Sequence, residues 1–396
     1  MTNDKKLINS IIPLELYEPD YGSSLTKTII GLEHLRVKKL SGSAPPYIFF
    51  QLKNIFQMFE SLGSARIEGN RTTLAEFVEK VIEIPNKKTN DEKIQEIFNI
   101  DNAIEFIEKN ISIGGKIDRA HISEIHKILV NKLTPPPRGE GSNYPGNFRQ
   151  INVIIQKSKH IPPDQVHIQS YMDELVKFIN QQADPQHDLL IAALSHHRMA
   201  WIHPFDNGNG RAVRMFTYAM LIKQGFQVKN GRILNPTAIF CMDRDKYYEM
   251  LSLADSGERI KTLQWCEYVL NGLKTEMEKI DRLLDKDYLV KSILLPSIQF
   301  SLEHENITHR EFEILRGVIN NKRMAVKSAD IKKIIREKSA VQISRIIKKL
   351  KEKGMLMSLK ESGRTYTISF SNNYLLRGVV NMLEKNDFIP KSLNKN

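Results

Sequence analysis

Hydrophobic and polar positions along the chain alternate mainly with the period of a helix. In residues 45–62, PPYIFFQLKNIFQMFESL, apolar side chains recur every three or four positions, which predicts an amphipathic helix. Gly69-Asn70 follows as a helix-stop signal. The same spacing predicts further helices over residues 92–110, 117–133, 164–182, 186–200, 211–224, 243–254 and 259–285. We therefore expect a mainly α-helical protein.

One stretch interrupts the helical pattern. Residues 134–147, TPPPRGEGSNYPGN, are rich in proline and glycine, so a helix cannot continue through them. Residues 152–155 are short and β-prone, and Ile161-Pro162-Pro163 ends the excursion. This pattern predicts a β-hairpin that stands off the helical body.

The pattern changes again after residue 285. Residues 286–297 have the composition of a connector. Beyond them the spacing predicts three helices and then two strands, over residues 308–320, 328–336, 339–353, 355–359 and 364–370. Three helices followed by a two-stranded ribbon outline a winged helix-turn-helix. We thus expect three units, which are an N-terminal helical region (1–90), a core (91–285) and a winged-helix domain with a tail (286–396).

Composition places the chain among ordinary globular proteins, with 396 residues, 41% hydrophobic and 26% charged. Its two cysteines, Cys241 and Cys266, form no CxxC pair, which argues against a disulfide framework and a zinc site. The N-terminus is polar, and no apolar run approaches the ~18 residues of a membrane span. We expect a cytoplasmic protein that does not enter a membrane.

The net charge of +12 is concentrated near the C-terminus. Residues 286–396 contain 22 Lys and Arg against 11 Asp and Glu, whereas the first 285 residues are nearly neutral. This favours an acidic partner such as DNA, with a solvated lysine-rich surface as the alternative. In a winged helix, residues 339–353 would enter the major groove, and residues 355–370 would form the wing. Protein contacts or dimerisation are the other use of such a module.

The segment from His203 to Arg211, HPFDNGNGR, carries the candidate chemistry. Gly208-Asn209-Gly210 stands where a loop becomes a helix, so the backbone can approach a phosphate and the free N–H groups of the first turn can bind it. Arg211 and Arg214 project cations from that turn. His203 can take the proton of an attacking hydroxyl near neutral pH, and Phe205 is expected to anchor the loop.

These residues resemble the Fic signature HxFx(D/E)GNGRxxR, and the resemblance extends over about residues 47–285. It implies that His203 is a general base and that the glycine turn holds the phosphates of ATP. It further implies a β-hairpin flap, Val153, Ile154, Ile155 and Gln156, which registers the target protein by strand addition. The ATP site implied by the resemblance comprises Glu68, Phe205, Gly208, Asn209, Gly210, Arg211, Arg214, Tyr247 and Tyr248.

One position departs from the signature. Asn207 stands where the family usually has the Asp or Glu that binds Mg²⁺. An amide oxygen brings no negative charge, and Mg²⁺ prefers carboxylates and phosphates. We expect Asn207 to bind Mg²⁺ (or Mn²⁺) more weakly, with the triphosphate as the main ligand of the ion.

A second motif precedes the core. Ser64 to Gly69, SARIEG, resembles the inhibitory motif (S/T)xxxE(G/N) of self-restrained Fic proteins. The resemblance implies that Glu68 pairs with Arg214 and competes with the γ-phosphate of ATP for it. In some family members this glutamate also supports removal of AMP. Fic proteins with this motif often self-associate, so a homodimer is an option.

The leading hypothesis is a protein adenylyltransferase that moves AMP from ATP to a Ser, Thr or Tyr hydroxyl of a target protein or of itself. A Fic enzyme with a different transfer, or with de-AMPylation activity, is the second. Relatives with other transfers usually differ at the glycine or arginine positions, and Gly208 and Arg211 are intact here. The third is a DNA-binding regulator whose degenerate Fic site senses ATP.

Overall fold

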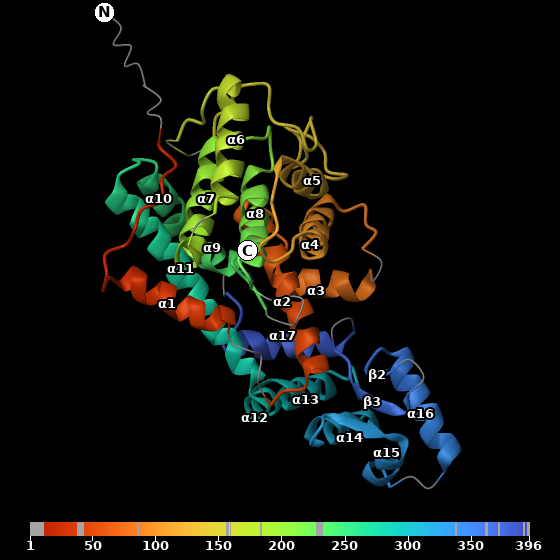
Figure 1. The fold of residues 1–396 in the computed structure, drawn as a ribbon. Coiled ribbons are helices and arrows are strands. Elements are labelled where there is room, and N and C mark those ends of the chain that lie inside the picture. Colours follow the sequence, from red (N-terminus) through yellow and green to blue (C-terminus); the bar gives the residue numbers. More distant parts are fainter. Residues whose placement is uncertain are drawn as a thin grey trace, which may run out of the picture.

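The computed structural model describes residues 12–37, 43–84, 87–155, 158, 160–182, 184–226, 233–336, 339–360, 363–370, 373–390 and 393. Helices dominate the fold (Figure 1). Through the first 285 residues the helices are α1 (Ser24–Val37), α2 (Pro46–Ile67), α3 (Leu74–Glu83), α4 (Glu92–Asn110), α5 (Arg119–Leu129), α6 (Ile168–Ile179), α7 (Asp188–Ile202), α8 (Asn209–Lys223), α9 (Thr237–Met242), α10 (Arg244–Ala254) and α11 (Arg259–Asp281). Short 3₁₀ turns occupy Gln165–His167, Pro185–His187 and Arg282–Leu284.

Local signals in the sequence fix several helix starts. Thr73 and Glu76 form a reciprocal capping box at the start of α3, and Asp91 caps α4 through the N–H of Lys93. Every helix predicted in residues 45–285 is present. The predicted range 92–110 coincides with α4, and the others differ from the observed helices by a few residues.

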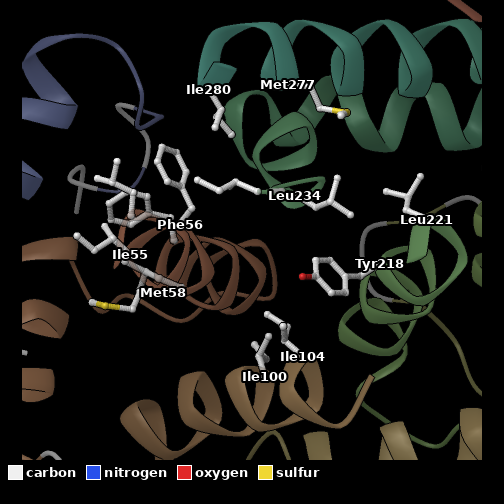
Figure 2. Packing of buried hydrophobic residues seen from close by; sticks show 14 of the residues in the cluster. Ile55, Phe56, Met58, Ile100, Ile104, Tyr218, Leu221, Leu234, Met277 and Ile280 are labelled. Atoms are coloured by element: carbon white, nitrogen blue, oxygen red, sulfur yellow. The ribbon is translucent and has the colours of Figure 1, made fainter. Parts of the chain in front are cut away.

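Helix α2 lies at the centre of the molecule and is buried on most of its surface. Figure 2 shows apolar side chains of α4, α8 and α11 around it, and its most extensive packing is with α4 and α9. Helix α1, which the pattern did not predict, packs along α11. The N-terminal helices are therefore packed into the same core as the motif-bearing helices, and burial of this size supplies the main stabilising free energy.

The C-terminal part begins without an extended connector. Residues 286–297, predicted as a connector, are helical in α12 (Lys286–Tyr288), a π-helical turn (Leu289–Leu294) and the start of α13 (Leu295–Glu303). The remaining elements are α14 (His309–Asn320), β1 (Ala325–Lys327), α15 (Ser328–Ile334), α16 (Ala340–Glu352), β2 (Leu356–Ser358), β3 (Thr365–Ile368) and α17 (Leu375–Lys385).

These strands form one antiparallel sheet in the order β1-β3-β2. Val326 of β1 and Ser358 of β2 both pair with Tyr366 of β3. The two predicted strands are present in shortened form. Strand β1 was not predicted, because it is only three residues long and too short for an alternating pattern to show. The order of helices and strands agrees with the expected winged-helix outline, while its use in DNA binding stays a prediction.

The C-terminal elements lie at one end of the molecule and contact α2 directly (Figure 1). The buried amide of Gln51 on α2 donates to the carbonyl of Ile368 (3.0 Å) and accepts from the N–H of Phe370 (2.9 Å). Helix α17 returns to pack against α13 and α3, and Arg377 of α17 pairs with Glu79 of α3. Within the described ranges, every helix is too short or too polar to cross a membrane.

Candidate active site

The HPFDNGNGR segment forms the turn between α7 and α8. Helix α7 ends at Ile202 because His203 adopts the left-handed conformation, with φ 51° and ψ 60°. Gly208 has φ 73° and precedes α8, a backbone conformation that glycine adopts without strain. The turn therefore exposes the first N–H groups of α8, which is the arrangement expected of an anion-binding helix N-terminus.

The turn is braced from inside. The side-chain amide of Asn209 accepts from the N–H of Phe205 and donates to its carbonyl, both at 2.8 Å. The ring of Phe205 is fully buried and stacks on His126, with ring centroids 3.7 Å apart. Phe205 thus anchors the loop, as expected, and Asn209 shapes the turn through its side chain.

His126 is a site residue that the sequence did not reveal. Its Nδ1 accepts from the N–H of Gly146 (3.0 Å), so Nε2 carries the proton and donates to the carbonyl of Asn207 (3.0 Å). Burial lowers the pKa of His126 to about 4. A neutral imidazole therefore joins the motif turn to the loop of residues 134–147.

His203 is partly buried at the end of α7. Burial lowers its pKa to about 4, the charges of His160 and Arg149 act in the same direction, and Glu68 acts against them. The ring also has a hydrogen bond to the backbone of Ala200. The imidazole is consequently neutral at neutral pH and can accept a proton, although it is a weaker base than an ordinary histidine.

Arg214 is held by the residues at the end of α2 that resemble the inhibitory motif. Its Nε donates to Ser64 Oγ (2.8 Å), and its Nη2 donates to the Ser64 carbonyl (2.9 Å) and to Glu68 Oε1 (2.7 Å). Burial raises the pKa of Glu68, but the adjacent Arg214 outweighs it and holds the pKa below its ordinary value. The expected pairing of Glu68 with Arg214 is therefore present as a charge-assisted contact.

The same carboxylate lies directly over the glycine turn. A Cβ added to Gly210 would stand 2.1 Å from Glu68 Oε1. Glu68 therefore reaches the first turn of α8, where the phosphates of a nucleotide are expected to bind. A side chain at this position would have to displace the Glu68 carboxylate.

Arg211 has a different environment. It is fully buried and lies 3.0 Å from the carboxylate of Glu96 on α4, and its Nη2 donates to the carbonyl of Glu140 (2.6 Å). Among the described residues, its Nε and Nη1 have no hydrogen-bond partner, because the Glu96 oxygen is badly aligned with them. Glu96 is held in turn by Asn70 (2.8 Å).

The residues near the expected metal position offer few ligands. Asn207 Nδ2 donates to the carbonyl of Gly141 (3.0 Å), which leaves its amide oxygen as the available acceptor. The carboxylate of Asp206 accepts from the hydroxyl of Ser142 and the N–H of Asn143. In the part of the chain that the structure describes, no group of three or more His, Cys, Asp or Glu side chains could hold a metal ion.

Tyr247, which is expected to contact adenine, is buried inside the protein. Its ring is 2% exposed, and its hydroxyl is 2.9 Å from Nε2 of His196, so it belongs to the core. A buried ring has no face to offer to a base. Tyr248 is 41% exposed, and Arg244 lies over its ring at 5.5 Å, so of the two tyrosines only Tyr248 presents a surface to a nucleotide.

The predicted hairpin is not formed in the described residues of the flap. Residues 151–155 are extended but pair with no strand, and Gln156 lies outside the described residues. Val153 and Ile155 are half-buried, whereas Ile154 is 89% exposed. β-Branched residues favour a strand only when a partner strand is available, and this segment is held by side-chain contacts instead.

Comparisons with known proteins agree with this site. Residues 116–221 match the sequence model of the Fic/DOC family. A protein adenylyltransferase Fic from Nematostella vectensis is 30% identical over 201 residues, which cover 49% of this chain and 42% of that protein. The corresponding Drosophila melanogaster protein is also 30% identical over 201 residues, which cover 49% of this chain and 37% of that protein. The match therefore spans less than half the length of these relatives.

Solved structures show the same fold. A Fic family protein from Desulfovibrio desulfuricans G20 aligns over 89% of this chain and 98% of its own, with a TM-score of 0.52 and 17% identity. A Fic domain containing signaling protein from Bacteroides thetaiotaomicron aligns over 66% of this chain and 98% of its own, with a TM-score of 0.51 and 17% identity. The mainly helical Fic fold class predicted from the sequence is thereby confirmed.

Proposed function

We propose that this protein is a protein adenylyltransferase that transfers AMP from ATP to a Ser, Thr or Tyr hydroxyl of a target protein or of itself. The observation that carries the proposal is the position of His203, a neutral imidazole one turn ahead of an anion-binding helix N-terminus with Arg211 in its first turn. A base beside a phosphate site is what nucleotide transfer to a hydroxyl requires.

The transfer itself follows from these groups. The acceptor hydroxyl gives its proton to His203 while its oxygen forms a bond to the α-phosphorus of ATP. The bond from that phosphorus to the bridging oxygen breaks, and pyrophosphate leaves with the electron pair. The N–H groups of residues 209–211 and the guanidinium of Arg211 stabilise the charge on the phosphates. Mg²⁺, when bound, would neutralise phosphate charge, with Asn207 as its protein ligand.

Glu68 supports a proposal of self-inhibition. Its carboxylate occupies Arg214 and overlies Gly210, so the γ-phosphate of ATP must compete with it for the same cation. A charge-assisted contact of this kind contributes about 1–3 kcal/mol. By the same arithmetic its loss is expected to accelerate transfer roughly ten- to a hundred-fold.

The test uses purified protein with α-labelled ATP and Mg²⁺ or Mn²⁺. Glu68→Gly should become labelled faster than the wild type, and intact-mass spectrometry should show an adduct of AMP mass on a hydroxyl side chain. Glu68→Gly/His203→Asn is the matched control, because Asn tolerates the left-handed backbone at this position but is not a base. Absence of label in folded Glu68→Gly, with both metals and with candidate targets, would overturn the proposal.

The exposed face of α16 supports a second function, DNA binding. This helix buries Ile343 and Ile347, while its outer face carries exposed basic side chains at Arg345, Lys348 and Lys349. A row of cations on an exposed helix fits a phosphate backbone. The same face serves a protein partner in the alternative use of the module.

A mobility-shift assay across a salt series separates these uses. DNA binding should weaken steeply as salt rises, and replacing Arg345, Lys348 and Lys349 by Gln should abolish the shift. Lys109, Lys116 and Lys127 are exposed and lie outside the C-terminal elements. Replacing them by Gln is a control with the same loss of charge. No shift at low salt contradicts DNA binding and leaves the adenylyltransferase proposal unaffected.

A further inference from the structure

Arg149 is a buried cation with an unusual set of partners. It is 3% exposed, and within the described ranges no Asp or Glu forms an ion pair with it. Its guanidinium donates instead to three backbone carbonyls, those of His203 (2.9 Å), Ile151 (2.8 Å) and Pro163 (2.6 Å). Burying a charged group in this way is costly unless its donors are satisfied, so the contacts fix the guanidinium in one place.

These contacts close the base of the segment 151–163. One guanidinium holds both ends of the segment, at Ile151 and Pro163. A second tie runs beside it, where the amide of Asn152 donates to Asp164 (2.9 Å) and accepts from the N–H of Gln165 (2.9 Å). Side-chain ties replace the strand ladder that the sequence predicted there.

The same groups attach the segment to the catalytic turn. The main-chain N–H of Arg149 donates to the carbonyl of Pro204 (2.8 Å), so Arg149 contacts the backbone on both sides of the His203–Pro204 peptide. On the far arm, His160 Nε2 donates to the carbonyl of Trp201 (2.8 Å). The carboxylate of Asp255 lies 3.7 Å from Nδ1 of His160 and steadies the ring.

We propose that Arg149 is a positioning residue that fixes the described residues 151–155 and 160–163, and with them the acceptor hydroxyl, relative to His203, and that His160 is a second anchor. This inference rests on the proposed function, because it takes the segment as the surface that presents the acceptor. The exposed Ile151 and Ile154 give that surface apolar side chains for a target chain to contact.

The proposal separates acceptor placement from nucleotide binding. The described contacts of Arg149 include none with Gly208, Arg211 or Arg214, which belong to the phosphate site. A displacement of about 1 Å between reacting groups can slow a transfer about a hundred-fold. Loss of Arg149 should therefore reduce transfer while leaving nucleotide affinity nearly unchanged.

The test compares Arg149→Lys and Arg149→Met in the Glu68→Gly background. Lys keeps a charge but cannot hold three carbonyls in a planar fork. We expect transfer from Arg149→Lys to fall about ten- to a hundred-fold by misplacement of the acceptor, with ATP affinity within about twofold. Arg149→Met also removes a positive charge that lowers the pKa of His203. The pKa of His203 should therefore rise, and the loss of transfer in acid should begin at a higher pH than in Arg149→Lys.

Three further variants guard against a purely structural explanation. Arg36→Lys is the control, because Arg36 on α1 is half-buried and donates to the Gln224 carbonyl (2.8 Å) and to Asp188 (2.9 Å), neither of which belongs to the flap. It should cost stability and retain transfer. At the less buried anchor, His160→Gln keeps an N–H donor for Trp201 and should retain transfer, whereas His160→Ala should lose it.

The outcomes are distinguishable. Transfer from folded Arg149→Lys at the Glu68→Gly rate, or a parallel loss of ATP affinity and transfer, overturns the inference. If the Arg149 variants do not fold, equal transfer from His160→Gln and His160→Ala overturns it. If Glu68→Gly alone does not transfer AMP, the proposed function has failed before Arg149 is tested.

Discussion

Two arginines one turn apart on α8 meet opposite conditions. Arg214 and Arg211 are both buried, and each faces a glutamate from another helix, Glu68 after α2 and Glu96 on α4. Every donor contact of Arg214 to that segment is short and well aligned, whereas Arg211 keeps two N–H groups without a partner among the described residues.

The two arginines therefore differ in how much hydrogen-bonding capacity their protein partners leave unused. Ser64 and Glu68 occupy Nε and Nη2 of Arg214, so a phosphate can bind these two nitrogen atoms only after this segment moves or is outcompeted. Arg211 is fully buried, and its Nε and Nη1 keep unused hydrogen-bonding capacity, so a phosphate oxygen that reached them would displace no aligned partner. Under the proposed function, ATP binding and restraint of transfer would fall to neighbouring side chains of a single helix.

The largest effect is expected from removing Arg214. Arg214→Met leaves Glu68 and the Ser64 carbonyl without their cation and should lower the free energy of unfolding by about 3 kcal/mol. Urea unfolding measures the loss, and Arg214→Met/Glu68→Gln should recover part of it because the unpaired carboxylate is gone. Equal stability of the single and double variants would contradict the pairing.

A smaller effect is expected at Ser64. Ser64→Ala removes one hydroxyl contact to a charged group and should lower stability by about 1–2 kcal/mol. It should raise self-labelling several-fold while Glu68 remains in place. Ser61→Ala, one turn earlier, is the control, since Ser61 bonds only its own helix at Gln57. Ser64→Ala with wild-type labelling argues against a role of α2 in restraint.

A still smaller effect is expected at Glu96. Glu96→Gln keeps the shape of the side chain but removes the negative charge beside Arg211, so ATP affinity should rise by about two- to five-fold, or less than 1 kcal/mol. Calorimetry with ATP measures it. A marked loss of affinity would mean that Glu96 orients Arg211 and does not merely compensate its charge.

The smallest effect is expected from mild acid. The pKa of Glu68 lies below its ordinary value in the folded state. Its pairing with Arg214 therefore stabilises the fold at any pH above the pKa of the unfolded state, and this stabilisation is lost as the pH falls through the lower pKa of the folded state. Restraint of the wild type should therefore be constant between pH 8 and about 5. In Glu68→Gly, transfer at saturating ATP should fall only as His203 protonates, below its wild-type pKa of about 4, because the Glu68 charge that favours the protonated ring is gone.

Sequence reasoning was most successful where the signal is local. Helical periodicity located α4 and α8, and the two motifs brought Glu68 and Arg214 to the same point although 146 residues separate them. It failed where tertiary contact decides. Val153 and Ile155 have strand propensity but no partner strand, and a tyrosine pattern cannot say that Tyr247 faces His196.

The residues that sequence reasoning missed differ in how visible they were. Glu96 lies four positions before Ile100 on the buried stripe of α4, and a charged residue in phase with apolar ones is a signal of a buried partner. His126 gives a similar signal, four positions after Ile122 on the buried stripe of α5, whereas Arg149 gives none. Their roles depend on carbonyls of Asn207 and His203, which only the folded chain brings to them.

The close approach of Gly210 to Glu68 has a consequence for genetics. Selection for hyperactive variants should return changes at Ser64 and Glu68, because these residues can be altered without touching the phosphate cradle. Gly210 should never appear among them, since a side chain there evicts the inhibitory carboxylate and fills the nucleotide's place at once. Such a selection should thus find gain-of-function substitutions at the end of α2, whereas substitutions in the glycine turn should cause only loss of function.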